Sequence, residues 1–433
     1  MALVLIVCCV AIAAMLTLAL TEHKLHPKHP SVRIFWAAPL CGAALLLLCG
    51  VLSPADVLRA FTADSAVNPI KILVLFFAMT LMSVFLDEVG FFRYMAGVVL
   101  SHAGTNQRKL FLLLYAAVSV LTLFTSNDIV VLTFTPFICY FTKSARIDPI
   151  PYLFAEFVAA NTWSMALVIG NPTNIYLAGG AGIGFFPYLR VMLLPTVAAG
   201  LVSLAVLLLL FRRPLALPMS PIPAEVTFRR RAPLVIGLVH LSLCTLLLAV
   251  SSYVGLDMWL IALGFSLSLF LFGAIAALLD RRRPFELLRT LLRLPYQLIP
   301  FVLAMFTLVL ALRAYGVSKE IFTSLAALPA IPTYGVLSFL SANLLNNIPM
   351  SVLFSSILSF SEKTSLGGVY ASIVGSNLGA YLTPLGALAG IMWSSLLLQN
   401  GVRLSFRRFV GYGALVAIPT LAAALLSLVL VTA

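Results

Sequence analysis

One polar stretch inside an apolar region constrains the fold of this chain more than any other feature. The stretch Thr125–Asp128 separates the apolar segment 110–124 from the apolar segment 129–140, which contains Pro136. Neither segment reaches the about 20 apolar residues that a helix needs to cross a bilayer. Irregular backbone survives in hydrocarbon only where it lines a cavity or is buried in protein. The stretch therefore predicts a re-entrant hairpin, 110–141, whose polar tip lies near mid-membrane depth.

The composition is typical of a polytopic membrane protein. Of the 433 residues, 62% are hydrophobic and 9% are charged, which is far from soluble usage. The net charge of +13 lies in short loops between apolar segments, so we expect membrane lipid as a partner and not nucleic acid. The six cysteines show no metal-ligand spacing, so we expect no structural metal and no cofactor. The sequence contains no GxSxG, HExxH or Walker motif, so no motif of these kinds indicates an enzyme.

The polar breaks recur in the same order in both halves of the chain. Each half contains three spans, a hairpin, a broken span and a full span. The ranges are 1–213 with hairpin 110–141 and broken span 150–185, a cytoplasmic linker at 214–232, and 233–433 with hairpin 321–361 and broken span 367–398. Pro69 falls on Pro295 at an offset of 226 residues, and Gly90 falls on Gly316 at the same offset. These matches predict an all-α fold of two five-span repeats, and the odd number of spans makes the second repeat inverted.

The distribution of Lys and Arg agrees with this inverted arrangement. If Met1 lies outside, all but six of the 27 Lys and Arg fall in cytoplasmic loops or beside them. The six others are Arg59, Lys71, Arg190, Arg313, Lys319 and Lys363. The positive-inside rule therefore predicts both termini outside the cytoplasm, in a bacterial-type inner (plasma) membrane.

Asp128 is the one acid of fourteen that this arrangement puts near mid-membrane. A carboxylate there costs about 2.5–3.5 kcal/mol on insertion scales, which makes it a candidate functional group. We interpret Asp128 as the carrier of a coupling proton. The alternative is an N-cap of the second hairpin arm, and the two roles are compatible. Glu156 lies 14 residues before Gly170, about 21 Å of helix, and is expected near the cytoplasmic interface.

Side-chain amides and hydroxyls occupy the other breaks. Amides both donate and accept hydrogen bonds, so they suit a cation or a neutral hydroxylated solute. The alternative is that they only satisfy backbone groups that are freed where the helices break. The candidate binding residues are Ser126, Asn127, Asp128, Asn171, Thr173, Asn174, Asn346, Asn347, Ser376, Asn377 and Thr383.

At these motifs the chain resembles the ion transporter superfamily, which includes arsenical pump membrane proteins, sodium/proton antiporters and citrate and dicarboxylate carriers. The motifs are LDEVGFF at 86–92, SNDIVVLTFTP at 126–136, GNPTNIYLA at 170–178, LLNNIPMSVL at 344–353 and GSNLGAYLTPLGALAG at 375–390. GNPTNIYLA looks like the citrate and sodium/proton branches, and the other four look most like the arsenical pump (ArsB) branch. The resemblance to that branch implies export of arsenite and antimonite in exchange for protons. The superfamily also implies a scaffold of outer spans around a moving unit of hairpins and broken helices.

The expected function is secondary active transport by alternating access, with proton-coupled efflux of arsenite or antimonite. Cys139 is the one cysteine near a break, but an Asn, Ser and Thr pocket can hold uncharged arsenite without thiols. The runner-up is a sodium- or proton-coupled carrier of a small anion such as citrate or a dicarboxylate, or a sodium/proton antiporter. A passive channel is the third alternative. The sequence leaves open an ATPase subunit and a homodimer as partners.

Overall fold

Helices make up all the regular secondary structure in the described part of the computed structural model. The described residues are 1–25, 34–64, 68–125, 127–220, 231–279, 285–360 and 366–432. The α-helices are α1 (Ala2–Leu25), α2 (Ala37–Leu48), α3 (Pro54–Thr62), α4 (Pro69–Glu88), α5 (Phe91–Ala103), α6 (Gln107–Phe124), α7 (Asn127–Ala145), α8 (Ile150–Trp163), α9 (Pro172–Gly180), α10 (Phe185–Leu210), α11 (Arg231–Val254), α12 (Met258–Leu279), α13 (Phe285–Leu292), α14 (Leu298–Ala314), α15 (Val317–Leu325), α16 (Ala330–Leu345), α17 (Asn347–Leu358), α18 (Leu366–Gly379), α19 (Leu388–Gln399) and α20 (Phe406–Thr432). Two 3₁₀ turns are η1 (Val168–Gly170) and η2 (Pro214–Ala216).

Several of these helices are long and apolar enough to span a membrane. In the described ranges they are α4, α6, α10, α11, α12 and α20, and α14 with α15, bent by 71°, makes a seventh if the pair counts as one span. Large apolar side chains face outward along them, such as Leu209 on α10 and Leu278 on α12, which lipid tolerates because its tails are equally apolar. The prediction of an all-α polytopic membrane protein is confirmed.

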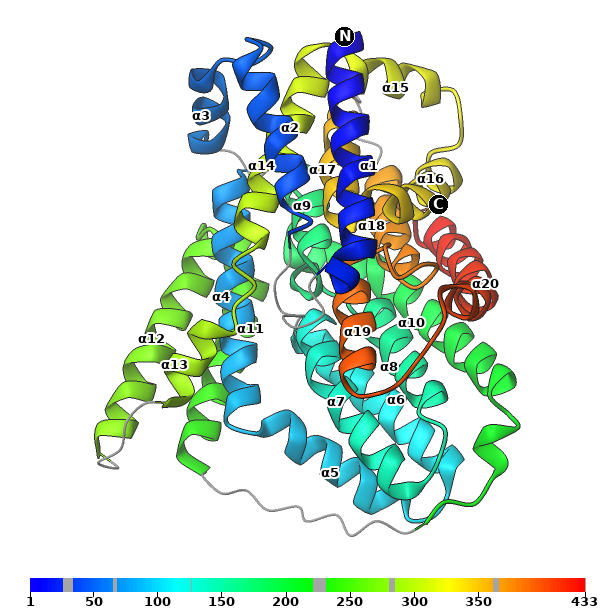
Figure 1. Ribbon diagram of the computed structural model, residues 1–433. Coiled ribbons are helices and arrows are strands. Elements are labelled where there is room, and N and C mark those ends of the chain that lie inside the picture. Colours follow the sequence, from blue (N-terminus) through cyan, green and yellow to red (C-terminus); the bar gives the residue numbers. More distant parts are fainter. Residues whose placement is uncertain are drawn as a thin grey trace.

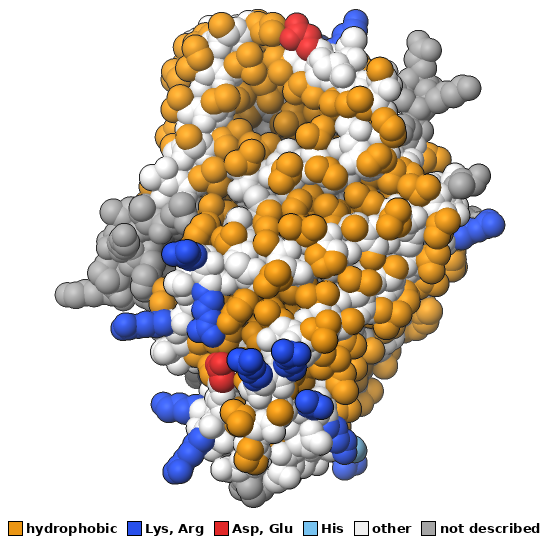
Figure 2. Space-filling model, turned by 90° about the vertical axis from the view of Figure 1, so that its right-hand side faces the viewer, with side chains coloured by type: hydrophobic (Ala, Val, Ile, Leu, Met, Phe, Trp, Pro, Cys, Tyr) orange, Lys and Arg blue, Asp and Glu red, His pale blue; other side chains and the backbone are white. Residues whose placement is uncertain are grey.

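Charge is distributed unevenly between the two ends of the molecule. Figure 2 shows hydrophobic side chains over the middle of one face, whereas most Lys and Arg side chains lie toward its lower end. In Figure 1, which shares this vertical axis, α5 lies at that end and the N-terminus at the opposite end. This asymmetry has the form that the positive-inside rule requires. The location of the termini relative to the cytoplasm remains a prediction.

The two halves of the chain contain matching series of helices. Helix α7 begins at Asn127 and α17 begins at Asn347, so the two helices are offset by 220 residues. Helices α8 and α18 are each 14 residues long and are offset by 216. Gly90 and Gly316 both adopt left-handed backbone, with φ of 89° and 80°, before α5 and α15, and glycine pays no steric penalty there. These matches support an internal repeat, and the inversion of the second half remains a prediction.

Several helices of each half pack against helices of the other half. Helices α1 and α2 of the first half pack against α14 of the second, while α11 and α12 pack against α4 of the first. In the same way, α7 packs against α19, and α17 packs against α9. Figure 1 shows α4, α11 and α12 at the left of the molecule and α6, α8, α10 and α20 toward the right. The second arm of each hairpin therefore rests on the broken helix of the other half.

Candidate functional site

The break between α6 and α7 is fastened to the broken helix that follows it. Asn127, the first residue of α7, donates its Nδ2 to Oδ1 of Asn161 on α8 at 3.0 Å. Asn161 donates its own Nδ2 to the Phe157 carbonyl at 2.8 Å. A second contact joins the same helices through Thr135 and Glu156. The order of the two contacts shows that α7 and α8 run antiparallel, with the polar tip beside Asn161.

Asn377 joins the broken helix of the second half to that of the first. Its Oδ1 lies 2.8 Å from Ser164 Oγ and accepts Nδ2 of Asn171 at 3.0 Å. Its Nδ2 donates to Asn174 Oδ1 at 2.7 Å and to the Ile373 carbonyl at 2.9 Å. An amide has two donor hydrogens and two acceptor lone pairs, so the Asn377 side chain is fully used. Asn377 positions the two breaks and has no spare hydrogen-bonding group for a solute.

The other two amides of this network are also largely occupied. Asn174 donates its Nδ2 to the carbonyls of Ser164 and Leu167 at 2.8 and 3.1 Å. Asn171 Oδ1 accepts the amide N–H and the hydroxyl of Thr173, each at 3.1 Å, and thereby caps α9. The structure thus brings Asn171, Asn174 and Asn377 together, and the bonds that it gives them brace the backbone.

The second hairpin tip is fastened to the break between α18 and α19. Asn346 adopts a left-handed φ of 73°, and its Nδ2 donates to the Leu385 carbonyl at 3.1 Å. The backbone N–H of Asn347 donates to the Gly386 carbonyl at 3.1 Å. Thr383 donates its hydroxyl to Oδ1 of Asn343 at 2.8 Å. Asn343 lies inside α16 and not at a break, which is why the sequence did not single it out.

Three of the predicted site residues, Ser376, Asp128 and Asn347, have side chains with no hydrogen bond to another described residue. Ser376 is fully buried, and its hydroxyl has no hydrogen-bond partner within the described ranges. Asp128 is half-buried on the first turn of α7, and no ion pair or hydrogen bond joins its carboxylate to another described residue. Ser126, the predicted companion of Asp128, lies outside the described residues. Asp128 is therefore the one acid at a hairpin tip that is available for exchange chemistry.

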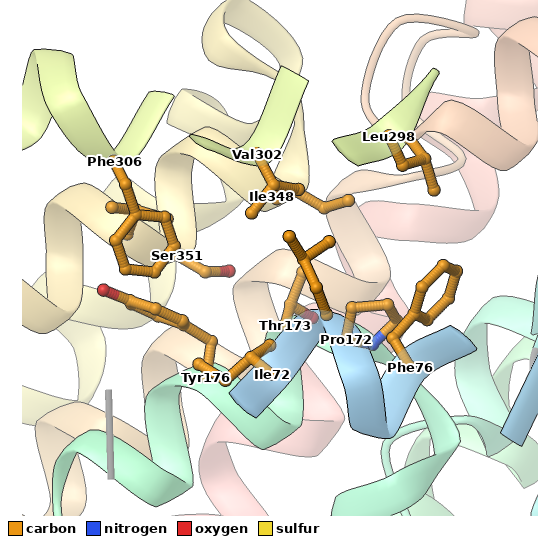
Figure 3. Close-up of a pocket in the computed structure, with 12 residues that line it drawn as sticks. Ile72, Phe76, Pro172, Thr173, Tyr176, Leu298, Val302, Phe306, Ile348 and Ser351 are labelled. Carbon is orange, nitrogen blue, oxygen red and sulfur yellow. The ribbon is translucent and has the colours of Figure 1, made fainter. Parts of the chain in front are cut away.

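A small, mostly apolar cavity of about 30 Å³ lies where α4 and α14 meet α9 and α17. Its lining contains Thr173 near the start of α9, Ile348 at the start of α17, and the hydroxyls of Ser351 and Tyr176. Figure 3 shows Ser351 directing its hydroxyl into this space. The remaining lining residues are Ile72, Leu73, Phe76, Pro172, Leu298, Val302, Phe306 and Val352. None of the described lining residues is charged, and none is a cysteine.

Glu156 lies in the interior of the helix bundle, and its depth near the cytoplasmic interface remains a prediction. Its side chain is fully buried inside the protein, and the Thr135 hydroxyl lies 3.0 and 3.1 Å from its two carboxylate oxygens. Trp393 of α19 approaches the same carboxylate. The distance along α8 does not predict this burial, because burial depends on how α7 and α19 pack around that helix.

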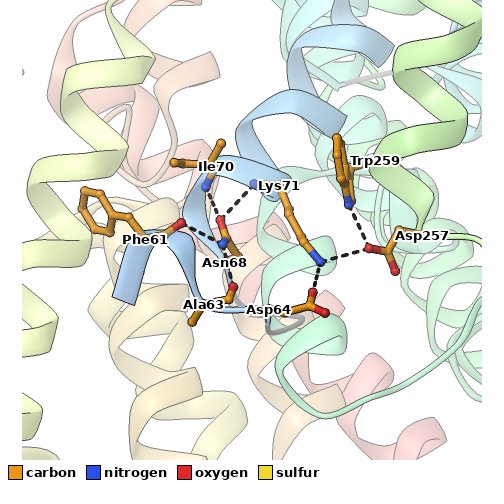
Figure 4. Close-up of polar contacts among 8 residues, drawn as sticks. All are labelled: Phe61, Ala63, Asp64, Asn68, Ile70, Lys71, Asp257 and Trp259. Carbon is orange, nitrogen blue, oxygen red and sulfur yellow. Dashed lines mark hydrogen bonds and ion pairs between the residues drawn. The ribbon is translucent and has the colours of Figure 1, made fainter. Parts of the chain in front are cut away.

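Ion pairs fasten both ends of α4 to the second half. At one end Lys71 Nζ lies 3.0 Å from Asp257, in the loop between α11 and α12, and also binds Asp64 (Figure 4). The hydrogen bond from Lys71 lowers the pKa of the Asp257 carboxyl, and a bond from Trp259 contributes. At the other end Arg293 pairs with Asp87 at 2.7 Å. Helix α4 is thereby fixed to α11–α14.

Within the described ranges, no group of three or more His, Cys, Asp or Glu side chains is arranged to hold a metal ion. The site that the structure assembles is instead a set of four helix breaks. Amides connect these breaks, an uncharged cavity lies beside them, and two acids, Asp128 and Glu156, belong to the first half. Such an arrangement can bind a small polar solute and exchange a proton.

Comparison with known proteins agrees with a transport role. Residues 16–368 match the family model described as CitMHS, citrate transporter. The chain is 29% identical to the arsenical pump membrane protein of Escherichia coli K12, over 92% of this chain and 93% of that protein. It is 25% identical to a putative arsenical pump membrane protein of Bacillus subtilis, over 85% and 88% of the two chains.

A solved structure shares the fold. The YdaH transporter of Alcanivorax borkumensis, whose crystal structure is described as having an unusual topology, superposes with a TM-score of 0.53 at 14% identity. The match covers 86% of each chain. The relatives in these comparisons are transporters and not enzymes. The chain is therefore an integral membrane transporter of the CitMHS citrate transporter family, within the ion transporter superfamily.

Proposed function

We propose that this protein exports arsenite or antimonite in exchange for protons, by alternating access. The observation that carries the proposal is the uncharged cavity beside the helix breaks, whose polar lining groups are the hydroxyls of Thr173, Tyr176 and Ser351. Arsenite is mostly an uncharged hydroxide at neutral pH. The Tyr176 hydroxyl can donate to it, and the Thr173 and Ser351 hydroxyls, which donate to Asn171 Oδ1 and the Asn347 carbonyl, can accept from it. A multivalent anion would enter this cavity without a cation to offset its desolvation.

The similarity to arsenical pump membrane proteins supports the same solute. It extends over 92% of this chain and 93% of the Escherichia coli protein, so it includes all four helix breaks and both halves. The cavity has no cysteine in its described lining, so three thiolates are not the means of binding. Hydroxyls and the N-terminal backbone of α9 and α17 supply the polar contacts instead.

Asp128 is the proposed carrier of the coupling proton. It lies at the tip of the first hairpin, and no cation among the described residues neutralises it. A proton neutralises the carboxylate whenever the tip is enclosed in a low-dielectric setting. A proton-motive force of about 180 mV supplies about 4 kcal/mol per charge, which supports a roughly thousandfold solute gradient. One proton per cycle is thus sufficient without ATP, and an ATPase subunit and a homodimer remain predictions.

The packing of helices of each half against the other half supports alternating access. The second arm of each hairpin rests on the broken helix of the other half, and α4 is fixed at both ends to α11–α14 by ion pairs. If the second half is inverted relative to the first, the two halves can exchange conformations and open the cavity to opposite sides.

A sodium- or proton-coupled carrier of a small anion is the second candidate, and one observation favours it. A cavity of about 250 Å³ between α3, α14 and α17 is lined by Arg313 and by Ser355, Ser356 and Ser359. It shares Tyr176, among other residues, with the uncharged cavity beside the helix breaks. A guanidinium and hydroxyl groups suit an anion on its way to the site.

Transport by everted membrane vesicles tests the proposal. The wild-type chain, expressed in a strain that lacks its own arsenite exporter, should accumulate arsenite when the vesicles are energised. A protonophore should abolish that accumulation, whereas replacing sodium with potassium should not change it. Sodium-dependent accumulation of citrate without accumulation of arsenite would contradict the proposal and support the second candidate. Conductance at channel rates in planar bilayers would instead support a passive channel.

A further inference from the structure

Glu156 is a buried acid that the proposed transport mechanism leaves without a role. It lies in the middle of α8 with no exposed surface. Its carboxylate oxygens lie 3.0 and 3.1 Å from the single hydroxyl of Thr135. A carboxylate taken out of water needs a cation, several hydrogen bonds or a proton to offset its desolvation. The neighbours of Glu156 decide which of these it has.

The described residues around Glu156 supply no cation. Thr135 and the thiol of Cys139 face it from α7, and Trp393 faces it from α19. Phe409 of α20 packs on the Trp393 ring, with centroids 5.7 Å apart. One hydroxyl and aromatic rings do not make the oxygen cage that a sodium ion requires, so a proton is the cation that fits this carboxylate.

The position of Glu156 connects it with Asp128. Thr135 follows Asp128 by seven residues on α7, so the two side chains share a helix face about 10 Å apart. Helix α8 runs antiparallel to α7, and the Asn127–Asn161 hydrogen bond at the tip fixes the register between them. The two acids are therefore about two turns apart along one helix interface, and the Thr135 hydroxyl lies beside Glu156.

The second half lacks this arrangement. Ser355 of α17 and Ser372 of α18 occupy the positions that correspond to Thr135 and Glu156 at the offsets of 220 and 216 residues. The Ser372 hydroxyl donates to the Gly368 carbonyl of its own helix at 2.8 Å. A buried acid at this position is therefore not a requirement for packing this helix pair.

We propose that Glu156 binds and releases a second proton in each transport cycle, so that two protons exchange for one solute. This inference rests on the proposed proton coupling. In one state the carboxylate takes a proton from one side of the membrane and forms an O–H bond. In the other state that bond breaks, the proton leaves to the opposite side, and the Thr135 hydroxyl donates to the carboxylate that remains. Thr135 is a positioning residue for this step.

The test measures the ratio of protons to arsenite in proteoliposomes that contain the full chain and a trapped pH dye. Wild type should give a ratio of two and Glu156→Gln a ratio of one, because glutamine keeps the shape but carries no exchangeable proton. Glu320→Gln, on the exposed surface of α15, is the matched control and should keep the ratio of two. An unchanged ratio in Glu156→Gln would overturn the proposal.

A second measurement is independent of transport. Infrared spectra of the full chain in detergent should contain a carboxylic-acid carbonyl band that persists in Asp128→Asn and disappears in Glu156→Gln. Thr135→Val should shift that band, because it removes the hydroxyl beside the carboxyl group. If Glu156→Gln does not insert, this shift decides the question, and its absence would contradict a protonated Glu156. Wild type with the band but no arsenite-driven proton flux would overturn the proposed function instead.

Discussion

The two hairpin tips have the same backbone arrangement but different side chains. Each second arm begins with an asparagine, Asn127 in α7 and Asn347 in α17. The next residue is Asp128 in the first half and Ile348 in the second. Ile348 lines the uncharged cavity, whereas Asp128 places a carboxyl group at the first tip. The difference indicates that the repeat supplies a common backbone scaffold. On this scaffold the first half places a carboxyl group and the second half places an apolar cavity wall.

The broken helices differ in the same way. Asn161 and Asn377 occupy corresponding positions in α8 and α18, and both join their helix to a neighbouring break. At the following helix start, however, Asn171 caps α9 through its side chain, whereas Ala387 precedes α19 without a side-chain cap. The first half therefore contains both acids, and the proposed proton exchange belongs to that half.

The largest effect should come from removing the acid at the first tip. Asp128→Asn should abolish arsenite accumulation in everted vesicles, a loss of the roughly thousandfold gradient that one proton supports. Asp148→Asn makes the same chemical change in the exposed loop between α7 and α8 and should keep the gradient. Accumulation at the wild-type level in Asp128→Asn, with both variants inserted equally, would refute the proton role.

The next effect separates the two corresponding amides. Asn377→Ala removes four hydrogen bonds and leaves Asn171 and Asn174 with unpaired buried atoms, so the free energy of unfolding should fall by about 1–3 kcal/mol. Asn161→Ala removes two bonds and should cost less. Thermal unfolding of both variants in detergent measures the difference. An equal or larger loss in Asn161→Ala would show that the connection between the halves is not the main brace.

The cavity hydroxyls should give a smaller effect, on affinity alone. Thr173→Val and Ser351→Ala should each raise the KM for arsenite by roughly threefold to tenfold, since a hydrogen bond contributes about 0.5–1.5 kcal/mol. The proton-to-arsenite ratio should stay unchanged. Thr80→Val is the matched control, because the buried Thr80 hydroxyl has no partner in the described chain and does not line this cavity. An unchanged KM in both cavity variants would place the solute elsewhere.

The smallest effect concerns the ion pair that fixes α4 to the second half. Lys71→Met should lower the free energy of unfolding by about 0.2–1 kcal/mol at neutral pH, because Asp257 is largely exposed and screened. Lys71 lowers the pKa of Asp257 in the folded state, so this contribution is present above the unfolded pKa. It is lost as the pH falls through the folded pKa. Thermal unfolding at neutral and acidic pH should show the variant and wild type converging in acid.

The class of fold could be predicted from the sequence because hydrophobic length alone separates membrane helices from soluble ones. Helix ends fall within the polar stretches, as at Asn127 and Asn347, because a broken helix needs side chains that satisfy its free backbone groups. The short helices α3, α5, α13 and α15 were not predicted. Two of them, α5 and α15, follow the left-handed turns at Gly90 and Gly316, which the sequence pattern marked only as repeat positions.

The candidate site was less accessible to sequence reasoning. Residue type indicates that Asn377 can donate and accept, but only the folded structure shows that all four of its hydrogen-bonding positions are used inside the protein. Asn343 and Ser164 were missed because they do not stand out from their apolar surroundings. The burial of Glu156 could not be predicted, because tertiary packing, and not distance along α8, determines it.

Proton flux driven by an arsenite gradient shows whether the protein exchanges arsenite for protons. Proteoliposomes that contain the full chain are loaded with arsenite and a pH dye, then diluted into arsenite-free buffer. Proton–arsenite exchange predicts that the interior acidifies as arsenite leaves, that Asp128→Asn abolishes the acidification, and that Ser372→Ala in the second half preserves it. Arsenite efflux at the wild-type rate without any proton entry would contradict it.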